Sequence, residues 1–191
     1  SAWTVECWFT HEAFVADAAI FQKGGGGGAW NGTNGVHYGF SFSGNKINWI
    51  FQHSAGSYTY FGSTTTPPVN EWNHLAVSYD GTNTSLFLNG VRENTRTGAN
   101  PVAPTTRDKF AIATGQVNGF TGADLKGNLT DFRISNVARY DPTQTTYTIP
   151  TAQFTSDSNT GLLLQGKEGA IIDKSQSVES VTLVADVKSS T

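Results

Sequence analysis

Residues 72–91 read WNHLAVSYDGTNTSLFLNGV, and this stretch decides the fold. Apolar and polar residues alternate from Trp72 to Tyr79 and again from Thr84 to Leu88, which is the pattern of strands with one buried face. Asp80-Gly81 separates the two runs and Asn89-Gly90 follows the second, and such pairs suit tight turns that need positive φ. The stretch therefore predicts two antiparallel strands joined by a short turn.

The same alternation recurs along most of the chain and predicts an all-β protein. Further strands are expected at residues 2–9, 18–23, 36–43, 46–53, 58–61, 109–114 and 128–135. Only residues 12–20 have a weak helical stripe, long enough for two turns. The expected core consists of the apolar members of these strands: Val5, Cys7, Phe9, Ile20, Phe40, Phe42, Leu75, Val77, Leu86, Leu88, Phe110, Ile112, Phe132 and Ile134.

The letters of residues 72–91 resemble the central signature of the laminin-G-like, concanavalin A-like lectin/glucanase jelly roll, and Asn128–Ser135 resembles the closing strand of that family. The resemblance covers about residues 2–165 and implies a two-sheet antiparallel β-sandwich. The segment from Val137 to Leu164 is similar to a subgroup found in structural proteins of tailed phages, especially marine ones. The expected domains are a jelly roll at 1–160 and, at 161–191, strands that complete it or begin a following repeat. We expect the chain to be a module or piece of a longer protein.

Composition narrows the classes of function. Only 14% of the residues are charged and the net charge is -3, which gives no electrostatic reason to expect nucleic acid or an anionic membrane as partner. No apolar run approaches the roughly 20 residues of a membrane span. Cys7 is the single cysteine and lies in an apolar strand, so a buried structural thiol is the expected role.

The patterns of several enzyme and metal classes are missing from the sequence. Glu6, Asp124 and Asp131 do not form the alternating carboxylate set of a glucanase strand, and they are interpreted as solvated or strand-edge charges. The four histidines show no zinc-type pairing, and His74 is expected to pack and hydrogen-bond near the sheet. Gly24–Gly28 lacks the lysine of a phosphate loop. No Gly-x-Ser-x-Gly elbow is present.

Two groups of aromatic and polar residues could bind a sugar, since an aromatic ring can stack on its apolar face and amides can fix its hydroxyls. One group is Trp30, Asn31, Asn34 and His37, and the other is Trp49, His53, Tyr58 and Tyr60. A structural role competes in both cases: Trp30 could cover the end of the core, and Trp49 shares a strand face with Ile47 and Phe51. Trp3 and Trp72 are more easily explained as core residues than Trp30.

The family resemblance also implies a calcium ion held by loop oxygens, as in many such jelly rolls. Asn118 and Asp124 are the candidate ligands, although the loop oxygens show no ordered spacing. Solvent-facing loop residues are the competing interpretation.

The function that the resemblance implies is a non-enzymatic structural or adhesion module of a virion, such as a tail fibre or capsid decoration. Its expected partners are other virion proteins and host cell-surface glycans, and a homo-oligomer is implied. The alternative is a carbohydrate-binding, lectin-like domain of a secreted, extracellular bacterial protein. A third hypothesis, a glucanase, would require an acid pair that the sequence does not show.

Overall fold

A computed structural model of the chain describes residues 1–24, 36–54, 57–98, 110–114, 124–167 and 170–175, with the backbone alone at 36, 37, 53, 54, 57, 58, 167 and 170. These residues form strands and no helix, so none of them belongs to a helix able to cross a bilayer. The strands are β1 (Trp3–Phe9), β2 (Ala19–Gly24), β3 (Val36–Ser43), β4 (Lys46–Ser54), β5 (Ser57–Gly62), β6 (Asn73–Tyr79), β7 (Asn83–Leu88), β8 (Val91–Thr97), β9 (Phe110–Ile112), β10 (Leu129–Ser135), β11 (Thr160–Lys167) and β12 (Ala170–Asp173).

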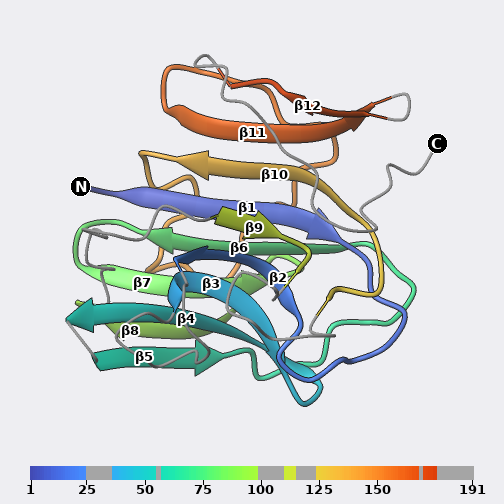
Figure 1. The fold of residues 1–191 in the computed structure, drawn as a ribbon. Helices are drawn as coiled ribbons and strands as arrows, with labels where there is room; N and C mark the ends of the chain where they lie inside the picture. The colour runs from blue at the N-terminus through green and yellow to red at the C-terminus, as the bar shows by residue number, and fades with distance from the viewer. Residues whose placement is uncertain (25–35, 55–56, 99–109, 115–123, 168–169, 176–191) are drawn as a thin grey trace.

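The strands pair into two antiparallel sheets that face each other. One has seven strands in the order β12-β11-β10-β1-β6-β7-β8, and the other has five in the order β5-β4-β3-β2-β9. Figure 1 shows the smaller sheet in front of the part of the larger one that β1 and its neighbours β6 to β8 form. The predicted two-sheet sandwich is confirmed, and the turn at Asp80-Gly81 joins β6 to β7 as expected.

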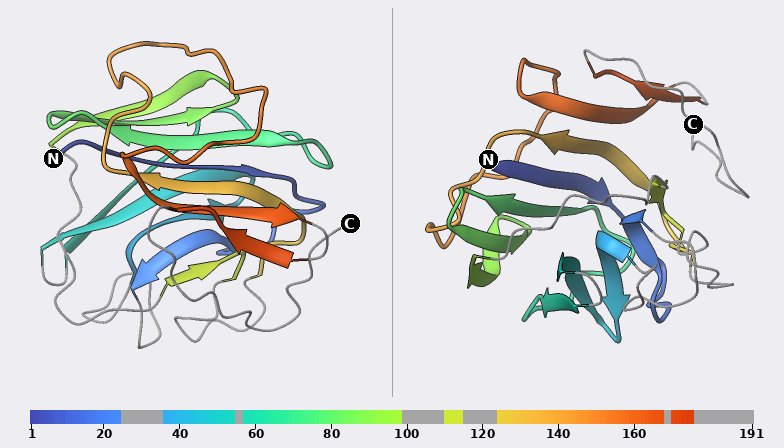
Figure 2. Two further views of the ribbon diagram at one scale, coloured as in Figure 1. Left: turned by 90° about the horizontal axis from the view of Figure 1, so that it is seen from above. Right: turned by 60° about the vertical axis from the view of Figure 1, so that its left-hand side comes forward.

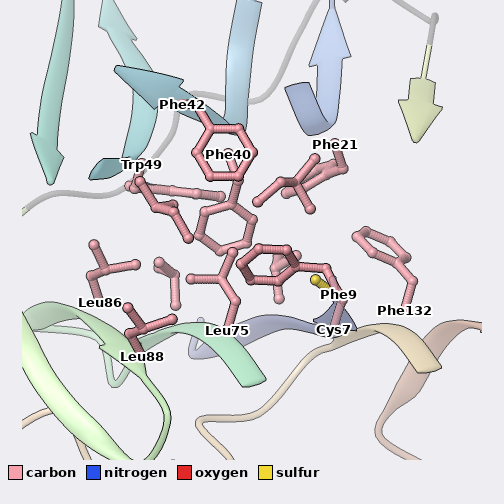
Figure 3. Close-up of a cluster of buried hydrophobic side chains, with 14 of the residues drawn as sticks. Cys7, Phe9, Phe21, Phe40, Phe42, Trp49, Leu75, Leu86, Leu88 and Phe132 are labelled. Atoms are coloured by element: carbon pink, nitrogen blue, oxygen red, sulfur yellow. The ribbon is translucent and has the colours of Figure 1, made fainter. Parts of the chain in front are cut away.

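Aromatic side chains fill the space between the sheets, as Figure 3 shows. Trp49 lies among them, with its ring centroid 4.9 Å from that of Phe40 and 5.7 Å from that of Trp3. The predicted core is confirmed in large part, because most of its members are buried. Three of them, Phe110, Ile112 and Ile134, are only partly buried and pack against the cluster.

The structure differs from the sequence-based expectations at a few places. Residues 12–20 form bends, a turn and the start of β2 instead of a helix, since two isolated turns do not offset the cost of helix nucleation. Strand β8 was not predicted, whereas β11 and β12 lie in the region from residue 161 where further strands were expected. Trp72 is a further correction: its side chain is 50% exposed just before β6, outside the core. Cys7 is fully buried, and burial raises the pKa of its thiol, which confirms the structural role.

The segment of residues 136–159 covers the outer face of the seven-stranded sheet. Thr4 Oγ1 of β1 donates to Val137 O at 2.8 Å, and Ser85 Oγ of β7 donates to Pro142 O at 2.8 Å. Further along the segment, the backbone N–H of Tyr147 donates to Gly90 O at 2.9 Å. Figure 2, left, shows this segment in orange on the far side of that sheet from the five-stranded one. The part of the larger sheet around β1, β6 and β7 therefore has other segments of this chain on both faces.

We expect Trp49→Ala to lower the free energy of unfolding by about 3–5 kcal/mol, because it leaves a large cavity in the core. Trp49→Phe should cost much less, since it keeps a ring and removes an indole N–H that has no hydrogen-bond partner among the described residues. Trp72→Ala is the matched control at a half-exposed tryptophan. Urea unfolding followed by tryptophan fluorescence and circular dichroism measures all three. Equal losses for Trp49→Ala and Trp72→Ala would contradict the placement of Trp49.

Candidate functional site

The outer face of the five-stranded sheet carries a row of paired residues. Tyr60 of β5 pairs with Ile50 of β4, Ile50 pairs with Gly39 of β3, and Gly39 pairs with Gln22 of β2. Directly paired residues in an antiparallel sheet point to the same face. Because Trp49, which adjoins Ile50, points into the core, this row faces away from it.

Exposure changes sharply along the row. Tyr60 is 59% exposed, whereas Ile50 is 7% exposed and Gln22 is fully buried. Tyr60 belongs to β5, which is the edge strand of its sheet. The aromatic ring is therefore accessible at the edge of the face, with less exposed residues beside it.

A second row lies next to the first and places a carboxamide near Tyr60. Asn48 pairs with Gly62 of β5 and with Ser41 of β3, and Gly62 is two residues from Tyr60, on the same face. A Cβ on Gly62 would lie 2.2 Å from Asn48 Oδ1, so the amide occupies space that only glycine leaves open. We call Tyr60, Asn48 and Gly62 the Tyr60 surface; their neighbours Ile50 and Ser41 on the same face are buried.

The Tyr60 surface offers an accessible ring beside a carboxamide with two N–H donors and an acceptor oxygen. Asn48 is half-buried, and its amide makes no hydrogen bond with the other described residues. A ring and an amide on one rigid sheet face can stack on an apolar ligand surface and hydrogen-bond its polar edge.

The structure separates the members of the second predicted group. Tyr60 lies on the outer face, whereas Trp49 is fully buried in the core. The prediction of Trp49 as a ligand-binding residue is therefore wrong, because solvent does not reach its ring. Successive side chains of β4 point to opposite faces of the sheet, so Trp49 points into the core together with Ile47 and Phe51.

The other predicted ligand-binding residues are described in part or not at all. His37, His53 and Tyr58 lie in β3, β4 and β5, and their side chains are outside the described part of the structure. Trp30, Asn31, Asn34 and the calcium candidate Asn118 lie outside the described residues, as does most of the Gly24–Gly28 tract.

Asp124, the other calcium candidate, accepts a hydrogen bond from the hydroxyl of Thr114. Its backbone forms isolated bridges with Ala19 and Thr114, at one end of the five-stranded sheet. Within the described ranges, no three acidic, histidine or cysteine side chains gather closely enough to hold a metal ion.

A buried ionic cluster lies on the outer face of the other sheet, beneath the segment of residues 136–159. Glu6 of β1 is fully buried, and its Oε1 accepts from Arg133 Nε at 2.8 Å and lies 2.7 Å from Arg133 Nη2. Tyr140 donates its hydroxyl to Glu6 Oε2. His74 Nε2 lies 3.3 Å from the same oxygen, without the alignment of a well-formed hydrogen bond. We call Glu6, His74, Arg133 and Tyr140 the Glu6 cluster.

Electrostatics within the Glu6 cluster favour the carboxylate form of Glu6. Burial raises the pKa of Glu6, but contacts with His74, Arg133 and Tyr140 outweigh it, so the pKa is below its ordinary value. Burial and the Glu6 charge raise the pKa of the Tyr140 hydroxyl. His74 Nδ1 also contacts the hydroxyl of Tyr147, which confirms the expected packing role of His74. Both oxygens of Glu6 are engaged and shielded, so the cluster is an internal anchor for the covering segment.

The interpretation of the acids as solvated charges is wrong for Glu6 and Asp131. Asp131 is also buried, and its Oδ1 accepts from the backbone N–H of Phe154 at 3.1 Å and from the side chain of Gln165. Both carboxylates have partners in distant parts of the chain. One signal was present in the sequence: Glu6 is the only charged residue of β1, and β10 carries the opposite charge of Arg133. The structure pairs them directly.

A comparison with protein-family models matches residues 1–143 to the family described as the concanavalin A-like lectin/glucanases superfamily. A search of curated proteins finds no match.

Solved structures with the same fold include carbohydrate-binding domains. A protein from Bacteroides ovatus ATCC 8483, provisionally assigned as carbohydrate binding, has a TM-score of 0.57 at 18% identity over 91% of this chain and 49% of its own. Domain 4 of the extracellular GH43 arabinanase AbnA from Geobacillus stearothermophilus, in complex with arabinotriose, has a TM-score of 0.52 at 18% identity over 71% of this chain and 61% of its own. The sialidase CBM40 from Ruminococcus gnavus, bound to α2,3-sialyllactose, has a TM-score of 0.55 at 14% identity over 66% of this chain and 70% of its own. These similarities show the fold alone, and this chain spans about half of the Bacteroides chain.

We expect the Glu6 cluster to make stability depend on pH in the acidic range. Because the pKa of Glu6 is lowered in the folded state, its contribution is present above the ordinary glutamate pKa and is lost as the pH falls through the folded value. Glu6→Gln should cost about 3–5 kcal/mol near neutral pH, since it leaves Arg133 without its buried partner. It should also make the decline of stability below about pH 4.5 shallower.

Thermal unfolding between pH 2 and pH 8 measures this dependence, with Glu71→Gln as the control at an exposed carboxylate. Other carboxylates with lowered pKa, such as Glu93, keep part of the slope in both variants. A Glu6→Gln protein with the stability and pH profile of the Glu71→Gln control would show that the cluster is not an anchor.

Proposed function

The chain belongs to the concanavalin A-like lectin/glucanase superfamily, and we propose that it binds carbohydrate without catalysis through the Tyr60 surface. The observation that carries this proposal is the exposed ring of Tyr60, which stands beside the Asn48 carboxamide on one sheet face. An aromatic platform next to a hydrogen-bonding amide suits the two kinds of surface that a sugar ring presents.

The compared structures support a carbohydrate ligand for this fold. The titles of two of them name bound saccharides, arabinotriose and sialyllactose. Because their identity to this chain is below 20%, they support the class of ligand and no particular sugar. They favour the lectin-like alternative over the virion module, since the reported relatives are carbohydrate-binding domains of bacteria.

The state of the buried acids supports a binding role over glycoside hydrolysis. Hydrolysis of a glycosidic bond needs two carboxyl groups that flank the bond. Glu6 and Asp131 are turned to partners within the protein and are shielded from solvent. A ligand on the Tyr60 surface would meet neither of them, because that surface belongs to the other sheet.

The single exposed ring of the Tyr60 surface suits weak binding that is strengthened by several copies. One exposed ring on a sheet edge buries little of a ligand, and linked copies raise the overall avidity without new contacts. Four further parts of the proposal rest on the family resemblance. They are a homo-oligomer, a location in a virion or outside a cell, contact with virion proteins or host glycans, and a bound calcium ion.

We expect Tyr60→Ala to weaken glycan binding by about tenfold or more, because truncation removes the stacking platform. Tyr60→Phe should retain most of the affinity, and Trp72→Ala should retain it fully as the control at another exposed aromatic residue. A glycan array followed by calorimetry on the strongest ligand measures the effect. Full binding by Tyr60→Ala, or no glycan bound by the unsubstituted chain, would overturn the proposal.

A further inference from the structure

We propose that the Tyr60 surface takes acidic saccharides, and that Lys46 and Arg96, two cations that flank it, are the groups that recognise their carboxylate or sulfate. The proposal rests on the proposed function and adds a class of ligand and two residues that determine it. Two observations carry it: the places of the two cations beside the exposed ring, and the neutral partners that leave their charges without a counterion.

Lys46 lies on the same outer face as Asn48. The two are separated by one position in β4, which puts their Cα atoms about 7 Å apart on one side of the strand. Lys46 Nζ donates to Thr64 O at 2.6 Å and to Thr66 Oγ1 at 3.1 Å, in an exposed position. Because an ammonium group has three N–H donors, these two neutral oxygens leave one donor for a ligand.

Arg96 flanks Tyr60 from a strand of the other sheet. β8 lies beside β5 at one edge of the sandwich, where Asn94 Nδ2 donates to Gly62 O at 3.1 Å (Figure 1). The guanidinium of Arg96 stands over the ring of Phe61, with Cζ 6.0 Å from the ring centroid. Phe61 adjoins Tyr60 in β5, and Tyr60 and Arg96 are both exposed. The second cation is therefore at the same edge strand as the accessible ring.

Neither cation forms an ion pair with any residue that the structure describes. The carboxylate at this edge is that of Glu93 in β8, which is buried and accepts four hydrogen bonds from Thr64 and Thr65. Burial raises the pKa of Glu93, but these hydrogen bonds outweigh it and hold the pKa below its ordinary value. One negative charge offsets at most one of the two positive charges, so the described part of this edge keeps a net positive charge.

An acidic saccharide on this edge gains attractions that a neutral one lacks. Its ring stacks on Tyr60 as that of a neutral sugar does, and its anionic groups meet a guanidinium and an ammonium that have no other countercharge. Each such pair is exposed and is worth little alone, so the two together set the preference. The whole chain has a net charge of -3, so a preference for acids arises from this local arrangement against the overall charge.

The spacing of the groups sets a minimum size for the ligand. Lys46 lies four positions along β4 from Ile50, the partner of Tyr60, which separates the Cα atoms of Lys46 and Tyr60 by about 14 Å. A ligand that reaches from the ring of Tyr60 to Lys46 is therefore an oligosaccharide, with an acidic unit away from the stacked sugar.

The experiment uses the chain of residues 1–191 on an array of neutral glycans, each beside its sialylated, uronate-bearing or sulfated counterpart, such as lactose beside α2,3-sialyllactose. We expect the acidic member of a pair to bind at least about fivefold more tightly at low salt. The advantage should shrink at about 1 M NaCl, because salt screens exposed charges.

Calorimetry on the strongest acidic ligand and its neutral counterpart then assigns the preference to the two cations. Lys46→Gln and Arg96→Gln should each weaken binding of the acidic ligand about two- to fivefold and leave the neutral one unchanged. The double variant should lose the preference. Lys126→Gln is the matched control, since it removes the charge of an exposed lysine in the bend before β10, and its affinities should not change.

Melting temperatures separate a lost attraction from a damaged fold, because the hydrogen bonds of Lys46 to Thr64 and Thr66 also hold the segment after β5. Lys46→Arg and Arg96→Lys keep the charge. Both should retain the preference for the acidic ligand, including where the glutamine variant melts earlier.

The outcomes of this experiment distinguish the two proposals. An array without any bound glycan overturns the proposed function. Binding that depends on Tyr60 but does not favour the acidic members overturns the role of the two cations and leaves the proposed function in place. A preference that survives in the double variant, or that falls equally in Lys126→Gln, has the same consequence.

Discussion

The burial of the Glu6 carboxylate is the constraint on which the arrangement of the molecule depends. A charge without access to solvent is tolerated only where partners compensate for its lost hydration. Its partners come from β10, from β6 and from the segment of residues 136–159. Pairing Arg133 with Glu6 fixes the register of β10 on β1, and the hydroxyl of Tyr140 holds the segment against the sheet.

The two outer faces of the sandwich differ, because only one of them carries the Glu6 cluster and its covering segment. The outer face of the seven-stranded sheet is occupied by the Glu6 cluster and by the residues that cover it. The five-stranded sheet presents Tyr60 to solvent at its edge, with Asn48 beside it. The acids Glu6 and Asp131 lie buried on the first face. The groups that we propose bind a ligand lie on the second.

Alternation predicted the strands and the core because the burial of one strand face is a local property of the sequence. Residues 72–91 carried enough of this signal to place β6, the turn at Asp80-Gly81 and β7. The same reasoning left Trp49 between a ligand-binding role and a core role, and the structure puts its ring wholly inside. Tyr60 was the one member of the second predicted group found exposed among the side chains described.

What the sequence could not supply is contact between residues far apart along the chain. Glu6 and Arg133 are separated by 127 residues, and only the pairing of β1 with β10 shows that their charges compensate each other. The position of Asn48 over Gly62 likewise depends on the register of β4 on β5. The residues around Asn48 and Gly62 show no unusual local pattern, so the carboxamide next to Tyr60 was missed.

The most direct test of this division is an amide and side-chain NMR titration of the isotope-labelled chain with the glycan that it binds best. The account predicts shift changes at Tyr60, Asn48 and Gly62 on the outer face of the five-stranded sheet, while Glu6, His74 and Tyr140 remain unperturbed. Shift changes centred on the Glu6 cluster, with none at Tyr60, would contradict it.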